Sequence, residues 1–265
     1  MSREAARAIG ASLRGVTKAF APRSAGQPAE TVVEGLTYTI EAGMFYTVFG
    51  PNAVGKTTML SLLAGLARPD SGDVVVDGGS AGRAAIGYVF QDFRDSLFPW
   101  RSAEHNLLFP LECLTSDVGE RRARLREFLA TFPLTLPLSA RTYELSVGQQ
   151  QILAVARALV GKPQLILMDE PFSALDYRTR RIMQDWIRGY WAQTCPTVLL
   201  VTHELDEAIL LGERLLLLAR RPVRELEEFR VDLPRPRSRT SLLTRECFEL
   251  RSRILMRFGN EGDTS

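Results

Sequence analysis

The sequence predicts an α/β fold in which helices cover a parallel sheet, and three successions of strand and helix predict it. The apolar run Met44–Phe49 is followed by a glycine-containing loop and a helical segment. The apolar run 164–168 precedes residues 177–191, where apolar side chains recur at the spacing of one helical face. The strand-like run Thr197–Val201 precedes a further predicted helix. Strands that alternate with helices in this way indicate a parallel sheet wrapped by helices.

Two regions depart from this alternation. Residues 11–90 are rich in β-formers and punctuated by turns, and the Pro, Ala, Ser and Gly residues at 21–30 predict a hairpin loop. Between Ala103 and Val160 there is little alternation and much Leu, Arg and Glu. We expect this second region to be a helical insertion, with helices near 120–132 and 149–159.

The most informative motif lies between the first strand and its helix. Glycines let a backbone curl so that successive N–H groups point at phosphate oxygens, and the following helix adds its positive N-terminal end. A lysine here reaches the β- and γ-phosphates, and the next hydroxyl can ligate Mg²⁺. This pattern predicts a site for a nucleoside triphosphate, and a turn that merely joins strand to helix is the weaker alternative. The nine residues of this phosphate loop are Gly50, Pro51, Asn52, Ala53, Val54, Gly55, Lys56, Thr57 and Thr58.

Composition sets the limits for this reading. The chain has 265 residues, 45% hydrophobic residues and a net charge of +2, so it has ample core and gives no global argument for nucleic acid. Its three cysteines, at 113, 195 and 247, are odd in number and far apart, which predicts reduced thiols. No signal-like stretch opens the sequence, and no segment approaches the ~18 apolar residues of a membrane span. We therefore expect any membrane-embedded part to come from another chain.

An apolar strand ends in two acids, Asp169 and Glu170. A strand that is buried on both faces should not end in paired carboxylates unless a cation or a reaction uses them. We expect Asp169 to hold Mg²⁺, directly or through water, and Glu170 to polarise an attacking water. A surface Asp-Glu pair at a strand end is the structural alternative.

Three further positions have both a functional and a structural interpretation. Ser146 and Gly148 open the predicted helix that contains Gln149, which makes either a second anion site or a plain helix cap. His203 follows a predicted parallel strand at its carboxyl end, where ligands bind, whereas His105 is assigned a structural role. Gln91 closes a strand where the helical region begins, so it is either a joint between lobes or an exposed polar residue.

Taken together and in this order, these motifs resemble the ATP-binding subunit of ABC transporters. The resemblance covers about residues 11–218, where Leu145–Gln149 matches the signature motif and Ser173–Asp176 matches the D-loop. It implies a P-loop NTPase core of ABC ATPase type, with an antiparallel β subdomain and a helical subdomain. The implied organisation is 1–91 for the β subdomain and the phosphate-loop part of the core, 92–160 for the helical subdomain, 161–218 for the rest of the core and 219–265 for a C-terminal extension.

The same resemblance implies a mechanism. Two subunits pack head to tail, so that ATP lies between the phosphate loop of one and the Ser146–Gly148 region of the other. Glu170 would be the general base, His203 would touch the γ-phosphate, and Gln91 would sense Mg²⁺ and report to the membrane partner. Phe20 would stack on adenine, although a strand Phe is ordinarily a core residue. Asp176, of the D-loop, completes the implied set.

Two positions depart from the family pattern, because Ala53 and Val147 stand where the family usually has Gly. If either residue must adopt a positive φ, its Cβ would strain the loop at a cost of ~1 kcal/mol or more. Gly50, Gly55 and Gly148 are retained, and we therefore expect binding and turnover to survive.

Two stretches indicate the subfamily. Residues 96–106, which include Leu97-Phe98-Pro99-Trp100, and residues 231–239, which precede a predicted amphipathic helix at 244–258, look like importers of nitrate, aliphatic sulfonates and taurine. This likeness implies a homodimer at the cytoplasmic face of the membrane, docked on a separate permease and served indirectly by a solute-binding protein. The Leu-Phe-Pro-Trp stretch is either a docking surface or a buried aromatic turn.

Two other classes of ABC-type ATPase share these catalytic motifs. A soluble ABC-type ATPase that acts on nucleic acid or ribosomes would carry coiled-coil insertions or two cassettes, and the sequence has one cassette and no heptad run. No nucleic-acid partner is therefore expected, although the Arg-rich tail leaves open a phospholipid or nucleic-acid contact beside the plainer interpretation of a solvated face. An exporter or lipid-transport ATPase would lack the two subfamily stretches.

Overall fold

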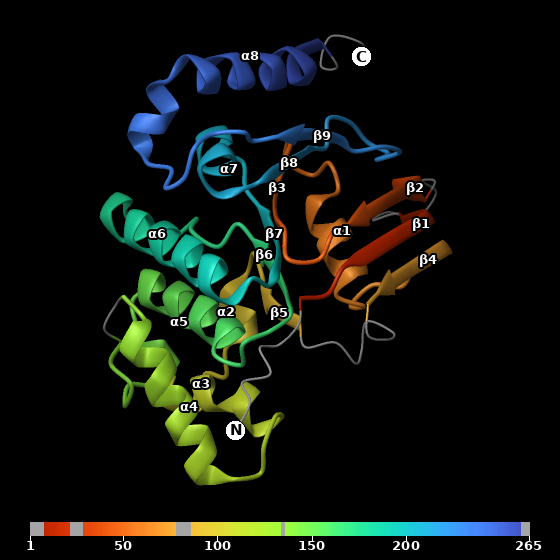
Figure 1. Ribbon diagram of the computed structural model, residues 1–265. Coiled ribbons are helices and arrows are strands. Elements are labelled where there is room, and N and C mark those ends of the chain that lie inside the picture. The colour runs from red at the N-terminus through yellow and green to blue at the C-terminus, as the bar shows by residue number, and fades with distance from the viewer. Residues whose placement is uncertain (1–7, 22–28, 78–85, 134–135, 261–265) are drawn as a thin grey trace. The chain divides into compact units, whose positions relative to one another are not determined.

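A computed structural model describes residues 8–21, 29–77, 86–133 and 136–260 (Figure 1). These residues divide into two units, one made of 86–133 with 136–196, the other of 8–21, 29–77 and 197–260. The division is discontinuous in sequence, because the second unit is built from both ends of the chain. The predicted hairpin loop at 21–30 falls largely on residues 22–28, outside the described part.

The second unit contains a three-stranded antiparallel sheet in the order β2-β1-β4. The hydrogen-bonded register pairs Ala11 with Ile40 on one side of β1 and with Val76 on the other. Buried and exposed residues alternate along part of each strand, which places Leu13, Val16 and Leu36 in the core. The strands are β1 (Ala11–Phe20), β2 (Glu30–Ile40) and β4 (Ser71–Val76).

The same unit holds a second sheet in which β7, β3 and β8 run parallel and β9 pairs antiparallel with β8. Every residue of β3 and β7 is buried, as expected for strands covered on both faces. The β3 pairing of Val48 with Val201 and Leu216 places the ends of these strands together, next to the start of α1. The elements are β3 (Phe45–Phe49), α1 (Lys56–Leu63), β7 (Thr197–Val201), α7 (Leu205–Leu211), β8 (Arg214–Leu217) and β9 (Glu227–Arg230).

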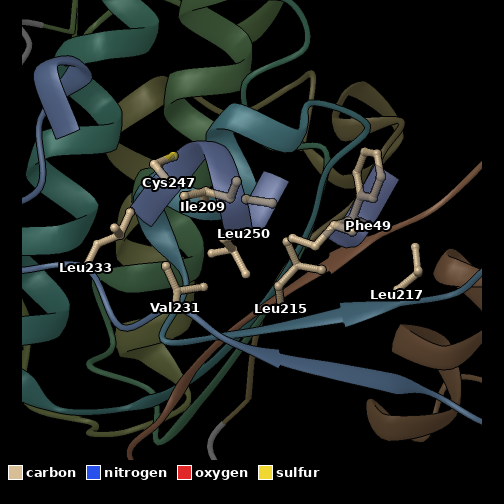
Figure 2. Close-up of a cluster of buried hydrophobic side chains, with 10 residues drawn as sticks. Phe49, Ile209, Leu215, Leu217, Val231, Leu233, Cys247 and Leu250 are labelled. Atoms are coloured by element: carbon tan, nitrogen blue, oxygen red, sulfur yellow. The ribbon is translucent and has the colours of Figure 1, made fainter. Parts of the chain in front are cut away.

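The C-terminal segment forms a layer of this unit. After the 3-10 turn Arg239–Leu243, helix α8 (Arg245–Asn260) buries Cys247, Leu250 and Ile254 against α7 and β8. Figure 2 shows this cluster, in which side chains from α8 meet those from strand and loop. The cluster reaches the phosphate loop, since the Phe258 ring centroid lies 5.5 Å from that of Phe49, the residue before Gly50.

The first unit pairs two parallel strands with a set of helices. Gly87 of β5 fits only as glycine, because a Cβ there would collide with the Ala158 carbonyl oxygen of α5. Helix α4 packs on α6 through Phe128, Phe132 and Trp186, whose rings lie edge to face or stacked. The elements are β5 (Ile86–Val89), α2 (Phe93–Ser96), α3 (Ala103–Glu112), α4 (Val118–Thr131), the 3-10 turn Thr142–Glu144, α5 (Val147–Leu159), β6 (Leu165–Asp169) and α6 (Tyr177–Thr194).

Most elements lie where the sequence predicts them, and β7 has the predicted bounds. Helix α5 starts at Val147, two residues before the predicted start, because Ser146 caps it. All three cysteines are free, as predicted, with Cys247 buried and the other two exposed. Within the described ranges, none of the helices combines the length and apolarity that a membrane span requires.

Candidate active site

The phosphate loop runs from the end of β3 to the start of α1 and closes on its own lysine. Lys56 is buried, and its Nζ donates to the carbonyl oxygens of Gly50 and Pro51 at 2.8 Å each. Thr57, one residue on, is exposed at the helix start, whereas Thr58 is partly buried. The cation, the hydroxyl and the helix N-terminus therefore gather at one short loop, which is the chemistry that holds a polyphosphate.

Two glycines of this loop are required by their surroundings. A Cβ at Gly50 would collide with the carbonyl oxygen of Leu218, the residue after β8. Gly55 has a φ of 125°, and a Cβ there would lie 2.8 Å from Val32 Cγ1. The backbone can approach its neighbours this closely only without side chains.

Ala53 is the strained residue of the loop. Its φ is 61°, in the left-handed region where a Cβ costs ~1–2 kcal/mol. Ala53 and Val147, the two residues that stand where the family usually has Gly, differ in this respect. Val147 is the first residue of α5 and has no positive φ, as its place in the helix requires. The strain is therefore confined to Ala53.

The acid pair ends a fully buried strand. Asp169 is the last residue of β6 and is 2% exposed, whereas Glu170 is partly buried and has a φ of 48°. A left-handed glutamate is uncommon, and such strain is typical of functional positions. Glu170 begins the turn that follows β6. Its carbonyl accepts a hydrogen bond from Ser173 N at 3.2 Å, which closes this turn.

Gln151 supports this turn and was missed by the sequence analysis. It lies on the buried face of α5, 1% exposed, and its Nε2 donates to the Glu170 carbonyl at 3.2 Å and to Ser173 Oγ at 3.1 Å. Its Oε1 accepts from Ala174 N at 2.8 Å. The Gln151 side-chain amide thus links α5, the helix that begins at the signature motif, to the turn that follows Glu170. The available signal was a third consecutive glutamine at a core-facing position of the helix.

The start of α5 lies at the surface. Ser146 Oγ accepts from Gln149 N at 3.3 Å, and Gln149 Oε1 accepts from Ser146 N at 2.9 Å, which forms a reciprocal cap. Ser146 and Val147 are exposed, and Gly148 is partly exposed. This end of the helix therefore presents its remaining N–H groups to solvent, where an external anion can reach them.

Asp176 has a structural role as the N-terminal cap of a helix. It caps α6, accepting from Arg178 N at 2.9 Å and Thr179 N at 3.0 Å. The Thr179 hydroxyl, followed by these backbone donors, lowers the pKa of the Asp176 carboxyl. The side chain is exposed, so this cap does not exclude a contact with a partner.

The remaining predicted residues are accessible. Gln91 lies two residues after β5, His203 lies two residues after β7, and both are exposed. Phe20, at the end of β1, is 44% exposed and so is not a core residue. Lys18 Nζ lies 5.5 Å from its ring centroid. His105, by contrast, lies in the first turn of α3, where its Nδ1 is hydrogen-bonded to the capping Ser102 Oγ at 2.8 Å.

Each unit holds a distinct part of the predicted set. One carries the phosphate loop with Phe20 and His203, and the other carries Gln91, the signature residues, the acid pair and Asp176. The phosphate loop comes from the ends of parallel strands, the position where α/β sheets bind ligands.

A family model described as ABC transporter matches residues 33–173, which include the phosphate loop, the signature and the acid pair. The chain belongs to the ABC transporter family. It is accordingly an ATP-binding protein and an ABC-type ATPase, and its α/β fold with an antiparallel β sheet and a helical part is the fold predicted from the sequence.

Members of the family resemble it over most of their length. The aliphatic sulfonates import ATP-binding protein SsuB of Bacillus cereus is 34% identical, over 95% of this chain and 96% of that protein. The taurine import ATP-binding protein TauB of Pseudomonas syringae pv. tomato is 38% identical, over 78% of this chain and 79% of that protein. Among solved structures, the dimeric post-hydrolysis ATP-binding cassette MJ0796 bound to ADP and Pi is 30% identical, with a TM-score of 0.73, over 83% of this chain and 98% of that one.

Proposed function

We propose that this chain is the ATPase subunit of an importer for a small anionic solute of the sulfonate, taurine or nitrate type. It would act as a peripheral protein on the cytoplasmic face of the membrane, docked on a separate permease and served by a solute-binding protein. The names of its relatives support an import role, and the sequence stretches at 96–106 and 231–239 support this subfamily. We also retain the four-part organisation, 1–91, 92–160, 161–218 and 219–265, as a proposal.

The nucleotide would be clamped between two copies arranged head to tail. The surface position of the α5 start carries this proposal, because Ser146 and Gly148 can act on a second copy's triphosphate only if they face outward. Burial of that motif within its own monomer would have ruled the arrangement out. The dimeric state printed for the solved cassette is consistent with it.

In this arrangement different residues would bind the nucleotide and hydrolyse it. Phe20 would stack on adenine, the loop N–H groups and Lys56 would hold the phosphates, and His203 would contact the γ-phosphate. Glu170 would accept a proton from the attacking water, and Gln91 would orient that water and report to the permease. ATP favours the closed dimer through contacts that the open form lacks, and hydrolysis removes that bias.

Magnesium would be held by Thr57, Asp169 and Gln91. Their hydroxyl, carboxylate and amide oxygens are the hard ligands that Mg²⁺ takes, so the donor set fits this ion. When bound, the ion neutralises charge that develops on the transferring phosphoryl group.

An aromatic surface on the first unit supports permease docking. Trp100 is 66% exposed, and Phe98 lies beside it with ring centroids 5.6 Å apart. Phe98 is also 4.8 Å from Phe109, and the Arg101 guanidinium lies 5.4 Å from the Phe98 ring. The exposed Trp100 argues against a buried aromatic turn, and Trp and Arg are the residues that dominate interfaces.

Trp100→Ala is therefore expected to weaken retention of the ATPase on its permease by at least about tenfold, in line with a hot-spot residue. The measurement is co-purification of the tagged chain with its permease from solubilised membranes, alongside the ATPase rate of the isolated chain, which should not change. Phe248→Ala is the matched control, because Phe248 is 68% exposed and lies on α8. Recovery of ribosomes or DNA in place of a membrane protein would reject the proposed function.

Gln151→Ala is expected to lower kcat about tenfold with little change in KM for Mg-ATP, since it loosens the turn that aims Glu170. Gln150→Ala is the matched control. The amide of Gln150 donates to the Thr142 and Leu145 carbonyls at 2.9 and 3.0 Å, and neither residue belongs to that turn. Steady-state phosphate release measures both variants. An equal loss in the two would show that Gln151 acts through general stability of α5.

A further inference from the structure

The segment that follows β8 runs beside the phosphate loop. Leu218 N donates to the Phe49 carbonyl at 2.9 Å, and the Leu218 carbonyl oxygen fills the space where Gly50 lacks a Cβ. Farther on, Val223 Cγ2 would lie 3.4 Å from a Cβ at Gly55. Residues 218–223 therefore contact both ends of the loop.

Arg221 contacts the middle of the phosphate loop. Its Nη1 donates to the Ala53 carbonyl at 3.4 Å and lies 2.6 Å from Glu30 Oε1. Glu30 is the first residue of β2 and pairs with Phe20 across the sheet. The guanidinium thus links the loop to the strand end that carries the proposed adenine-stacking residue. The Arg221 side chain is partly buried, with 27% of its surface exposed, whereas Glu30 is 62% exposed.

The contact acts on the strained residue of the loop. In a trans peptide the carbonyl and the following N–H point in opposite directions, so a fixed Ala53 carbonyl directs the Val54 N–H away from Arg221. Glycine would hold a φ of 61° without help, but alanine is strained there and has other conformations of lower energy. An external donor on the carbonyl favours the one conformation in which this N–H keeps its orientation.

We propose that Arg221 is a positioning residue that holds the Ala53–Val54 peptide in the orientation that binds phosphate. This inference rests on the proposed function of the phosphate loop, and it assigns to Arg221 a task that glycine at position 53 would make unnecessary. It explains how a loop with alanine at position 53 keeps a phosphate-binding form. Arg221 acts through the loop backbone and needs no contact with the nucleotide.

The test is a double-mutant cycle on the full-length chain, with Mg-ATP as the ligand. Arg221→Ala is expected to raise the Kd and the KM for Mg-ATP about 3–10-fold, as for the loss of one charge-assisted hydrogen bond, with kcat within about twofold. In an Ala53→Gly background the same substitution should change the Kd less than about twofold, because glycine needs no support. Arg221→Gln, which keeps a donor and a similar length, should recover part of the affinity, and it replaces Arg221→Ala if that variant does not fold.

Two further variants separate the explanations. Arg224→Ala removes the same charge three residues away, where an exposed arginine pairs with Glu34 of β2, and it should leave the Kd unchanged. Lys56→Ala should abolish Mg-ATP binding. Normal binding there would refute the proposed loop function and this inference with it. If Lys56→Ala loses binding, the Arg221 proposal is overturned by an unchanged Kd in Arg221→Ala, by an equal rise in the Ala53→Gly background, or by an equal rise in Arg224→Ala.

Discussion

Replacing Glu170 by Gln is expected to slow ATP hydrolysis by about 10²–10⁴-fold while Mg-ATP still binds with nearly normal affinity, because the amide keeps the side chain's shape but cannot accept a proton. The backbone supports this specific role. A φ of 48° and the bond from Gln151 fix the direction in which the side chain leaves the sheet. Steady-state phosphate release measures the rate of hydrolysis, and the Kd for Mg-ATP measures whether binding is preserved.

Glu225→Gln serves as the matched control, because it makes the same chemical change at an exposed position after β8. It should hydrolyse ATP at the normal rate. Near-normal turnover in Glu170→Gln would instead remove Glu170 from the role of general base.

The same variant tests the head-to-tail dimer. With hydrolysis blocked, Mg-ATP should convert Glu170→Gln from monomer to dimer in size-exclusion chromatography. Adding Ser146→Arg, a bulky cation at the exposed α5 start, should return it to monomer without abolishing nucleotide binding. A dimer that persists in this double variant would contradict the clamp between the two copies.

The parts of the site that sequence reasoning found depend on local pattern. The phosphate loop and its flanking strand and helix are specified by glycines, a lysine and an apolar run within 20 residues, and they lie where predicted. The strand Thr197–Val201 was predicted with its observed bounds because all five residues are apolar or β-branched and all are buried. In these segments local propensity and tertiary burial agree.

The parts that it missed depend on distant contacts. Helix α3 contains Pro110 and was not predicted. Ser102 caps its start, and Pro110 near its end removes one backbone hydrogen bond without ending the helix before Glu112. The positive φ of Glu170 was not predicted, whereas the possibility of one at Ala53 was raised from the sequence. In the sequence Gln151 resembles any other polar helix residue. Only the fold brings its amide to the turn that follows Asp169 and Glu170.

The Arg-rich tail illustrates the same point. A solvated face was the plainer expectation, and for Arg237 it is wrong, since this side chain is 1% exposed. Its guanidinium donates to the carbonyls of Leu233, Ile209, Gly212 and Val231, and it pairs with Glu213 at 3.5 Å. Two of these carbonyls lie at the C-terminal end of α7, where the helix leaves its acceptors unpaired. No periodicity in the sequence distinguishes Arg237 from its exposed neighbours.

Arg237→Ala is therefore expected to destabilise the C-terminal layer by about 3–5 kcal/mol, because several buried carbonyls lose the one guanidinium that donates to them. The reactivity of Cys247 can report on local opening of this layer. Cys247 is a residue of α8 and is fully buried in the cluster, whereas Cys113 and Cys195 are exposed. Burial also raises the pKa of the Cys247 thiol. In the parent chain two thiols should react rapidly with a disulfide reagent and the third slowly. In Arg237→Ala the third should react about 10²–10³-fold faster through local opening.

Arg235→Ala provides the matched control for this measurement. Arg235 is partly exposed and pairs with the same carboxylate, Glu213, so its loss should cost only about 0–1 kcal/mol and leave Cys247 protected. Equal deprotection in the two variants would mean that pairing with Glu213, and not the buried carbonyls, holds the layer. Since Phe258 of the same helix contacts Phe49 beside the phosphate loop, a selective loss in Arg237→Ala should also raise the KM for Mg-ATP. That joint outcome would make the C-terminal layer a structural support of the nucleotide site.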